Sequence, residues 1–117
     1  MKIRNGFISN SSSCAFIIVN VSDKKLTLVD FVKENPQLVE EYNEMYDEDY
    51  TQDDMIKSAQ MRMDDKKYRA ITFKPNEFKY CVFGDEQGDV IGRVFDYILR
   101  DGGTSKNFSW RFKEYLR

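Results

Sequence analysis

The sequence of 117 residues contains no histidine. Histidine is the usual general base near neutral pH and a common zinc ligand, so Ser-His-Asp triads, Cys-His pairs and His-ligated zinc sites are excluded. The sequence also has no glycine-rich phosphate loop, no GxSxG motif and no CxxC pair. These absences weigh against an enzyme, and we predict no catalytic residue and no cofactor.

Long apolar runs are also missing. The longest extends from Cys14 to Val19, far short of the roughly 20 residues that a membrane-spanning helix needs. The basic start of the chain is followed by Asn and Ser instead of an apolar segment, so we expect no signal peptide, no membrane partner and a cytoplasmic location. The two cysteines, Cys14 and Cys81, lie in apolar runs, which predicts reduced structural thiols; a disulfide stays open if their strands are neighbours.

The sequence contains enough large apolar side chains for one folded domain, since 41% of the residues are hydrophobic and 15% are aromatic. Residues 1–13 contain few core-forming side chains and many Ser and Asn residues, which favour turns. We therefore expect a serine-rich N-terminal arm over residues 1–13 and a single domain over residues 14–117.

The hydrophobic pattern of this domain predicts four strands and four helices. The strands are expected at residues 14–21, 69–73, 78–84 and 107–117. The helices are expected at residues 27–34, 36–46, 51–63 and 90–100. A Pro-Asn turn between the second and third strands predicts a hairpin. The order β-α-α-α-β-β-α-β predicts an α+β fold, with helices mainly on one face of a roughly four-stranded antiparallel or mixed sheet.

Acidic residues are concentrated in one part of the chain. Residues 34–54 contain nine acidic side chains and no basic one. The net charge is −9 over residues 34–65, but +3 before this segment and +4 after it, so the overall charge of −2 conceals a dipolar molecule. A dense acidic surface on a helix can steer toward a basic partner and can imitate the phosphates of nucleic acid. The alternative is a solvated helix face followed by an exposed loop.

Three tyrosines occur at four-residue spacing among these acids. Tyrosine is frequent among interface anchors, although the same helical spacing would also place these rings against the sheet. We predict a partner-binding surface that consists of Glu40, Glu41, Glu44, Asp47, Glu48, Asp49, Tyr42, Tyr46 and Tyr50. The acids lack the spacing and the central glycine of an EF-hand loop, so we predict no metal site.

The C-terminal strand interleaves Phe108, Trp110 and Phe112 with the cations Arg111 and Lys113. Such a mixture would suit a small module that binds single-stranded nucleic acid. Because successive side chains of a strand point to opposite faces, we expect instead that the rings lie in the core and the cations are exposed. Direct nucleic-acid binding is therefore the second hypothesis, and a small enzyme that uses Ser, Asp or Glu is the third.

The N-terminal segment carries a recognisable string, Gly6, Phe7, Ile8, Ser9, Asn10, Ser11, Ser12, Ser13 and Phe16. It resembles the start of many small uncharacterised bacteriophage and bacterial proteins, which have Gly-Phe-Val-Ser-Asn, a serine run and then Phe. Cys14 and Ala15 stand where that pattern more often has serine. The resemblance covers roughly the first 18 residues; it implies a phage-type protein, acting in the host cytoplasm if phage-encoded, and no activity. Physically, Ser9, Asn10, Ser11, Ser12 and Ser13 could bind phosphate or a protein backbone, or could form side-chain-supported turns.

The sequence as a whole predicts a non-enzymatic, phage-type accessory protein that binds a host or phage protein through its acidic surface. Its charge would suit an inhibitor of a nucleic-acid-handling machine. The sequence does not predict an oligomeric state.

Overall fold

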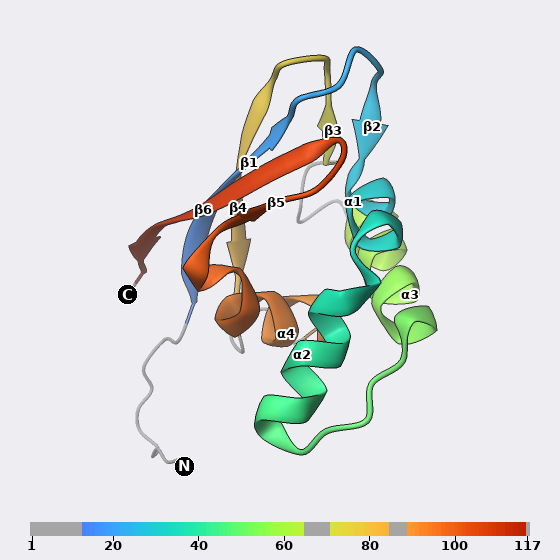
Figure 1. Ribbon diagram of the computed structural model, residues 1–117, viewed down its shortest axis with the longest axis vertical. Helices are drawn as coiled ribbons and strands as arrows, with labels where there is room; N and C mark the ends of the chain where they lie inside the picture. The colour runs from blue at the N-terminus through green and yellow to red at the C-terminus, as the bar shows by residue number, and fades with distance from the viewer. Residues whose placement is uncertain (1–12, 65–70, 85–88, 117) are drawn as a thin grey trace.

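The computed structural model describes residues 13–64, 71–84 and 89–116. Its strands are β1 (Cys14–Asn20), β2 (Leu26–Thr27), β3 (Thr72–Phe73), β4 (Phe78–Phe83), β5 (Gly103–Thr104) and β6 (Phe108–Tyr115). Its helices are α1 (Leu28–Glu34), α2 (Pro36–Tyr46), α3 (Gln52–Asp64) and α4 (Val90–Ile98), and a 3-10 turn, η2 (Leu99–Asp101), follows α4. The α+β prediction is confirmed: an antiparallel sheet of order β4-β1-β6-β5 has the helices gathered on one side (Figure 1).

Helices α1, α3 and α4 begin where short polar side chains cap them, whereas α2 begins at Pro36 without a side-chain cap. The Thr27 hydroxyl accepts a hydrogen bond from the Asp30 backbone N–H at 3.3 Å, and the Asp30 carboxylate accepts one from the Thr27 N–H at 2.8 Å. Thr51 and Asp54 form the same reciprocal pair before α3, at 2.9 and 3.0 Å. Asp89 caps α4 by accepting from the Gly92 N–H at 3.0 Å. These local interactions explain why the predicted helix starts are confirmed.

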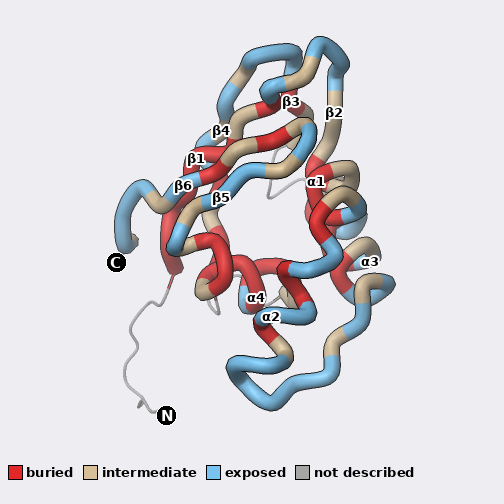
Figure 2. The backbone as a smooth tube through the Cα atoms, viewed as in Figure 1, coloured by how far each residue is buried: buried red, intermediate tan, exposed pale blue. Residues whose placement is uncertain are grey.

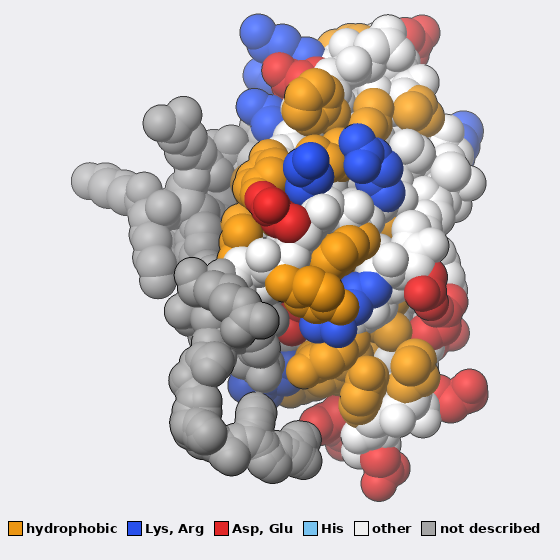
Figure 3. Space-filling model, turned by 90° about the vertical axis from the view of Figure 1, so that its left-hand side faces the viewer, with side chains coloured by type: hydrophobic (Ala, Val, Ile, Leu, Met, Phe, Trp, Pro, Cys, Tyr) orange, Lys and Arg blue, Asp and Glu red, His pale blue; other side chains and the backbone are white. Residues whose placement is uncertain are grey.

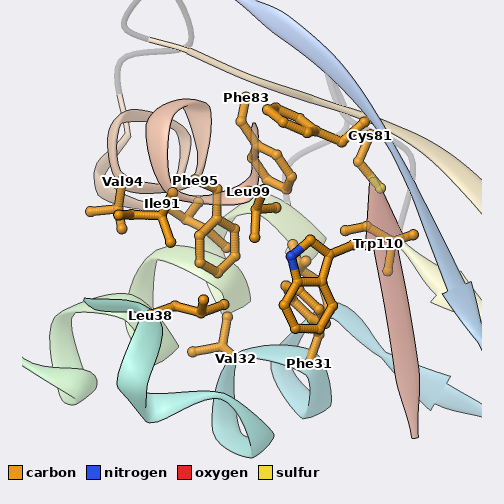
Figure 4. Packing of buried hydrophobic residues seen from close by; sticks show 14 of the residues in the cluster. Phe31, Val32, Leu38, Cys81, Phe83, Ile91, Val94, Phe95, Leu99 and Trp110 are labelled. Atoms are coloured by element: carbon orange, nitrogen blue, oxygen red, sulfur yellow. The ribbon is translucent and has the colours of Figure 1, made fainter. Parts of the chain in front are cut away.

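Phe31 of α1 lies at the centre of the core between the helices and the sheet (Figure 4). Its ring meets those of Phe95, Phe108 and Trp110 edge to face, with centroids 5.5, 5.1 and 5.3 Å away. Such contacts add to the stabilisation that comes from burying the rings. Burial follows this packing, because the strands of the sheet and the inner faces of the helices contain the buried residues (Figure 2).

Strand β1 occupies the middle of the sheet, where it pairs with β4 and β6. Its pairing with β6 contains a bulge, because Ala15 pairs with Glu114 and Phe16 with Phe112, which leaves Lys113 as an extra residue. Cys14 of β1 and Cys81 of β4 therefore lie on neighbouring strands, and Cys81 pairs with Phe16. Both cysteines are buried free thiols.

The predicted hairpin between the second and third strands is wrong. Strand β3 pairs with β2, and the fourth strand of the main sheet is the short β5, which pairs with β6. The buried Asn20 explains this arrangement, because its side-chain Nδ2 donates to the carbonyls of Lys24 and Phe73 at 2.6 and 3.1 Å. These bonds tie the end of β3 to the loop before β2, and the turn at residues 74–77 then carries the chain into β4.

Among the described residues, no helix is both long enough and apolar enough to span a bilayer.

Candidate protein-binding surface

The predicted acidic residues gather at one end of the molecule, on α2 and the loop that leads to α3 (Figure 1). Helix α2 buries Leu38, Val39 and Tyr42 against the core, so the residues between them point to solvent. The exposed acids are Glu40, Glu41, Glu44, Asp47, Glu48 and Asp49, which we call the acidic end. The tube in Figure 2 shows this tip of the molecule as a continuous exposed segment.

None of these six carboxylates forms an ion pair within the part of the chain that the structure describes. The ion pairs found there join Arg62 to Asp89, Lys79 to Glu77 and Arg100 to Asp96, all away from the acidic end. Six like charges that form no ion pair with the described residues create a negative potential over this surface. The surface therefore attracts cations in solution.

Asn43 holds the acidic loop in one conformation. Its side-chain Nδ2 donates to the Tyr50 carbonyl at 2.7 Å, and its Oδ1 accepts from the Tyr50 N–H at 3.1 Å. The Asn43 carbonyl accepts hydrogen bonds from the backbone N–H of Glu48, at 3.1 Å, and of Asp47. Asp47 ends α2 and has a left-handed backbone conformation with φ 55°. Asn43 was not predicted as a site residue; in the sequence it stands out only as an amide among acids, seven residues before Tyr50.

The three predicted tyrosines lie together, and Tyr97 of α4 joins them. The Tyr46 ring centroid lies 4.9 Å from that of Tyr42 and 5.2 Å from that of Tyr97, and the Tyr50 centroid lies 6.1 Å from that of Tyr42. Tyr42 is buried, whereas 42% of Tyr46 and 66% of its neighbour Met45 are exposed. We call Tyr42, Tyr46, Tyr50 and Tyr97 the tyrosine cluster; its one buried ring, Tyr42, packs against the exposed Tyr46, which with Met45 forms an apolar patch beside the acids.

Two arginines border the tyrosine cluster. Arg93 donates to the Tyr50 hydroxyl at 2.9 Å, and the Arg100 guanidinium lies 4.7 Å from the Tyr97 ring centroid. Burial alone would lower the pKa of Arg100, but its hydrogen bond to the buried Asp96 and the charge of that carboxylate raise it. Arg93, Tyr97 and Arg100 were not predicted, although their spacing of four and three residues places them on one side of α4 and η2.

Most of the predicted motif arm, Ser9, Asn10, Ser11 and Ser12, lies outside the described residues. Ser13 is buried, and its carbonyl accepts from the Leu116 N–H at 3.0 Å. Gly84 passes close to it, since a Cβ atom at Gly84 would lie 2.4 Å from the Ser13 Cα. Ser13 therefore belongs to the packed domain.

The two thiols, the possible metal ligands and the side chains of β6 bear on the other hypotheses. Burial raises the pKa of both the Cys14 and Cys81 thiols to about 12, so neither is a thiolate near neutral pH. No group of three or more metal-ligating side chains occurs within residues 13–64, 71–84 and 89–116. In β6, Phe108 and Trp110 are buried while Arg111 and Lys113 are exposed, as strand alternation predicts.

Comparison with known proteins identifies no relative. No family model matches the chain, and neither the curated proteins nor the solved structures yield a similar one. The likeness of the N-terminal string to phage proteins stays a prediction.

Proposed function

We propose that this chain is a non-enzymatic accessory protein of phage type that binds a basic surface of a host or phage protein through its acidic end. The observation that carries the proposal is the run of six exposed carboxylates on α2 and the loop after it, with Met45 and Tyr46 exposed between them in the sequence. Carboxylates would select a basic partner, and the two apolar side chains would supply buried contact area.

Two observations favour a contact surface over a merely solvated helix face. Asn43 fixes the backbone of Tyr50 through paired hydrogen bonds, and the two large side chains of Met45 and Tyr46 are exposed beside the acids. The uncompensated charges of the acidic end repel one another, which opposes folding. A basic partner would relieve this repulsion, so part of the binding free energy would come from neutralising the surface.

The partner class that best fits this charge is a protein whose own ligand is nucleic acid. Its binding groove would be lined with Lys and Arg side chains that normally contact phosphates. The acidic end could occupy such a groove, and inhibition of a nucleic-acid-handling machine would follow from that occupancy. The association would weaken as salt is added, because exposed charges are screened.

The test compares two triple variants with equal change in charge. One carries Glu41→Gln, Glu44→Gln and Glu48→Gln in the acidic end, and the control carries Asp23→Asn, Asp64→Asn and Asp101→Asn at exposed positions elsewhere. Affinity capture from host extract identifies candidate partners, and calorimetry with each purified partner then measures Kd. We expect the wild type and the control to bind basic proteins equally and the acidic-end variant to bind at least about tenfold more weakly.

Equal recovery of the same partners by all three proteins would show that the acidic end is not the contact surface. A separate variant with Met45→Ser and Tyr46→Ser tests the apolar patch without changing charge, and it should also weaken binding.

A further inference from the structure

The sheet has a second face, opposite the helices, on which aromatic side chains are exposed. Phe78, Tyr80 and Val82 of β4 alternate with the core-facing Cys81 and point to this face. Phe78 is 61% and Tyr80 is 48% exposed. The space-filling view toward this side shows hydrophobic side chains interspersed with Lys and Arg (Figure 3).

One cation, Arg111, lies in the same row of the sheet as Tyr80. Tyr80 pairs with Ile17 of β1, and Ile17 pairs on its other side with Arg111 of β6, which is exposed. Phe78 pairs in the same way with Val19, and Val19 with Ser109. We call Phe78, Tyr80, Val19, Ile17 and Arg111 the sheet face.

More cations lie just beyond the Phe78 end of the sheet face. Three loops meet there around the buried Asn20, whose backbone N–H donates to the Glu77 carbonyl at 3.0 Å. These loops carry the four lysines Lys24, Lys25, Lys74 and Lys106 against the two acids Asp23 and Glu77, and Glu77 pairs with Lys79 of β4 at 3.9 Å. This lysine-rich end lies at the opposite tip of the molecule from the acidic end (Figure 1).

We infer that the sheet face binds single-stranded nucleic acid, with Phe78 and Tyr80 as stacking platforms. Residues two apart on a strand are separated by about 6.6 Å, so adjacent unpaired bases could each stack on one ring. Arg111 and the lysines of the three loops would contact the phosphates and supply the charge complementarity. Stacking on an exposed ring requires unpaired bases, so a single strand fits where a duplex does not.

The surrounding charges favour one path for the nucleic-acid backbone across the sheet face. Glu114 accepts a hydrogen bond from the Tyr80 hydroxyl and lies on the sheet face side of Ala15, away from the loops. Its carboxylate would repel phosphate at that end. The backbone path therefore runs from Arg111 past Phe78 toward the lysine-rich loops, and the distant acidic end stays clear of it. This site is separate from the protein-binding surface proposed above.

The test is fluorescence anisotropy with labelled 12-nucleotide oligo-dT and oligo-U and a labelled duplex, at 50 and 200 mM salt. The stacking variant carries Phe78→Ala and Tyr80→Ala, and the control carries Met45→Ala and Met61→Ala, two exposed apolar residues outside the sheet face and the lysine-rich end. We expect saturable binding of the single strands that weakens with salt, the control to match the wild type, and the stacking variant to lose at least about tenfold in affinity. Arg111→Gln should weaken binding and reduce its salt dependence.

Three results would overturn the inference: no saturable binding of either single strand at 50 mM salt, equal binding of the duplex, or equal binding by the stacking variant. Sedimentation velocity adds a fourth, because concentration-dependent dimerisation that disappears in the stacking variant would identify a second copy of this chain as the occupant. The triple variant Glu41→Gln, Glu44→Gln and Glu48→Gln should retain nucleic-acid binding, which separates this result from the test of the acidic end.

Discussion

Asn20 donates a hydrogen bond from its side-chain Nδ2 to the carbonyl oxygen of Phe73, 53 positions later in the chain and 3.1 Å away. The same side chain accepts from the Ser22 backbone N–H at 2.9 Å, and the residue is completely buried. Asn20 thereby joins β1 to the loops that carry the lysine-rich end. One amide organises chain segments that are far apart in the sequence.

Replacing Asn20 with Ala should lower the free energy of unfolding by about 2–3 kcal/mol, because buried backbone groups lose their partners. Urea denaturation at pH 7 measures the change. Val21→Ala is the matched control, since Val21 is the next residue and is 48% exposed. A loss as small as that of the control would mean that water replaces the Asn20 hydrogen bonds without cost.

Arg62 joins three elements, and its removal should be among the most damaging single changes. Its guanidinium donates to both carboxylate oxygens of Asp89, at 3.0 and 2.9 Å, and to the Val82 carbonyl at 2.6 Å. We expect Arg62→Met to destabilise the protein by about 3–5 kcal/mol, because it leaves a partly buried carboxylate without its partner. Lys57→Met, at an exposed position of the same helix, is the control.

A double-mutant cycle with Asp89→Asn then separates the Arg62–Asp89 pair from the bond to Val82. Additive losses in urea denaturation would show that the two side chains are not coupled.

The free energy of unfolding should decrease as the pH falls through the pKa of Glu34, because protonation removes the contribution of this carboxylate. Burial acts to raise the pKa of this carboxyl, but hydrogen bonds from Ser105 and from the backbone and side chain of Asn107 outweigh it, so the pKa lies below its usual value. A lowered pKa in the folded state contributes stability that is present above the pKa of the unfolded chain and disappears as the folded pKa is crossed.

The difference in unfolding free energy between the wild type and Glu34→Gln should therefore shrink between pH 6 and pH 3. Urea titrations at four pH values measure it. A constant difference over this range would contradict the assignment.

Both thiols should be unreactive in the folded protein. Their pKa of about 12 and their burial leave almost no accessible thiolate at pH 8. We expect Ellman's reagent to detect no fast-reacting thiol in the native protein and two after denaturation. Thr104→Cys, at an exposed position, is the positive control and should react at once. Failure of both native thiols to react after denaturation would reveal a disulfide.

The parts of the fold that could be predicted are those that depend on near neighbours in the sequence. The start of α1 follows from Thr27 and Asp30, which are three residues apart and cap the helix reciprocally. The acidic residues also behave as their spacing predicts, because α2 turns Leu38 and Tyr42 inward and leaves the residues between them exposed. Local chemistry alone determines these features.

The parts that could not be predicted depend on long-range pairing. The alternation of side chains in β4 is visible in the sequence. The charge of Lys79 suggests that the face with Lys79 and Cys81 is the exposed one, but Phe78, on the other face, is the more exposed side chain. Lys79 can share a face with the buried Cys81 because it lies near the end of the strand, where it pairs with Glu77 at 3.9 Å. The approach of Tyr97 to Tyr46 likewise requires α4 to pack near α2, which no local pattern encodes.

The extra residue in β6, Lys113, changes which face of the sheet each later residue of the strand occupies. Up to Phe112, even-numbered positions face the helices, so an unbroken strand would point Glu114 inward and Tyr115 outward. Lys113 reverses that parity: Glu114 reaches the hydroxyl of Tyr80 on one surface, and Tyr115 comes under the guanidinium of Arg100 on the other. Deleting Lys113 would place Glu114 directly after Phe112 and restore a regular pairing with both residues on their present surfaces, whereas a regular strand that kept Lys113 would exchange them. The bulge, and not the residue types alone, therefore determines which chemistry each side of the molecule displays.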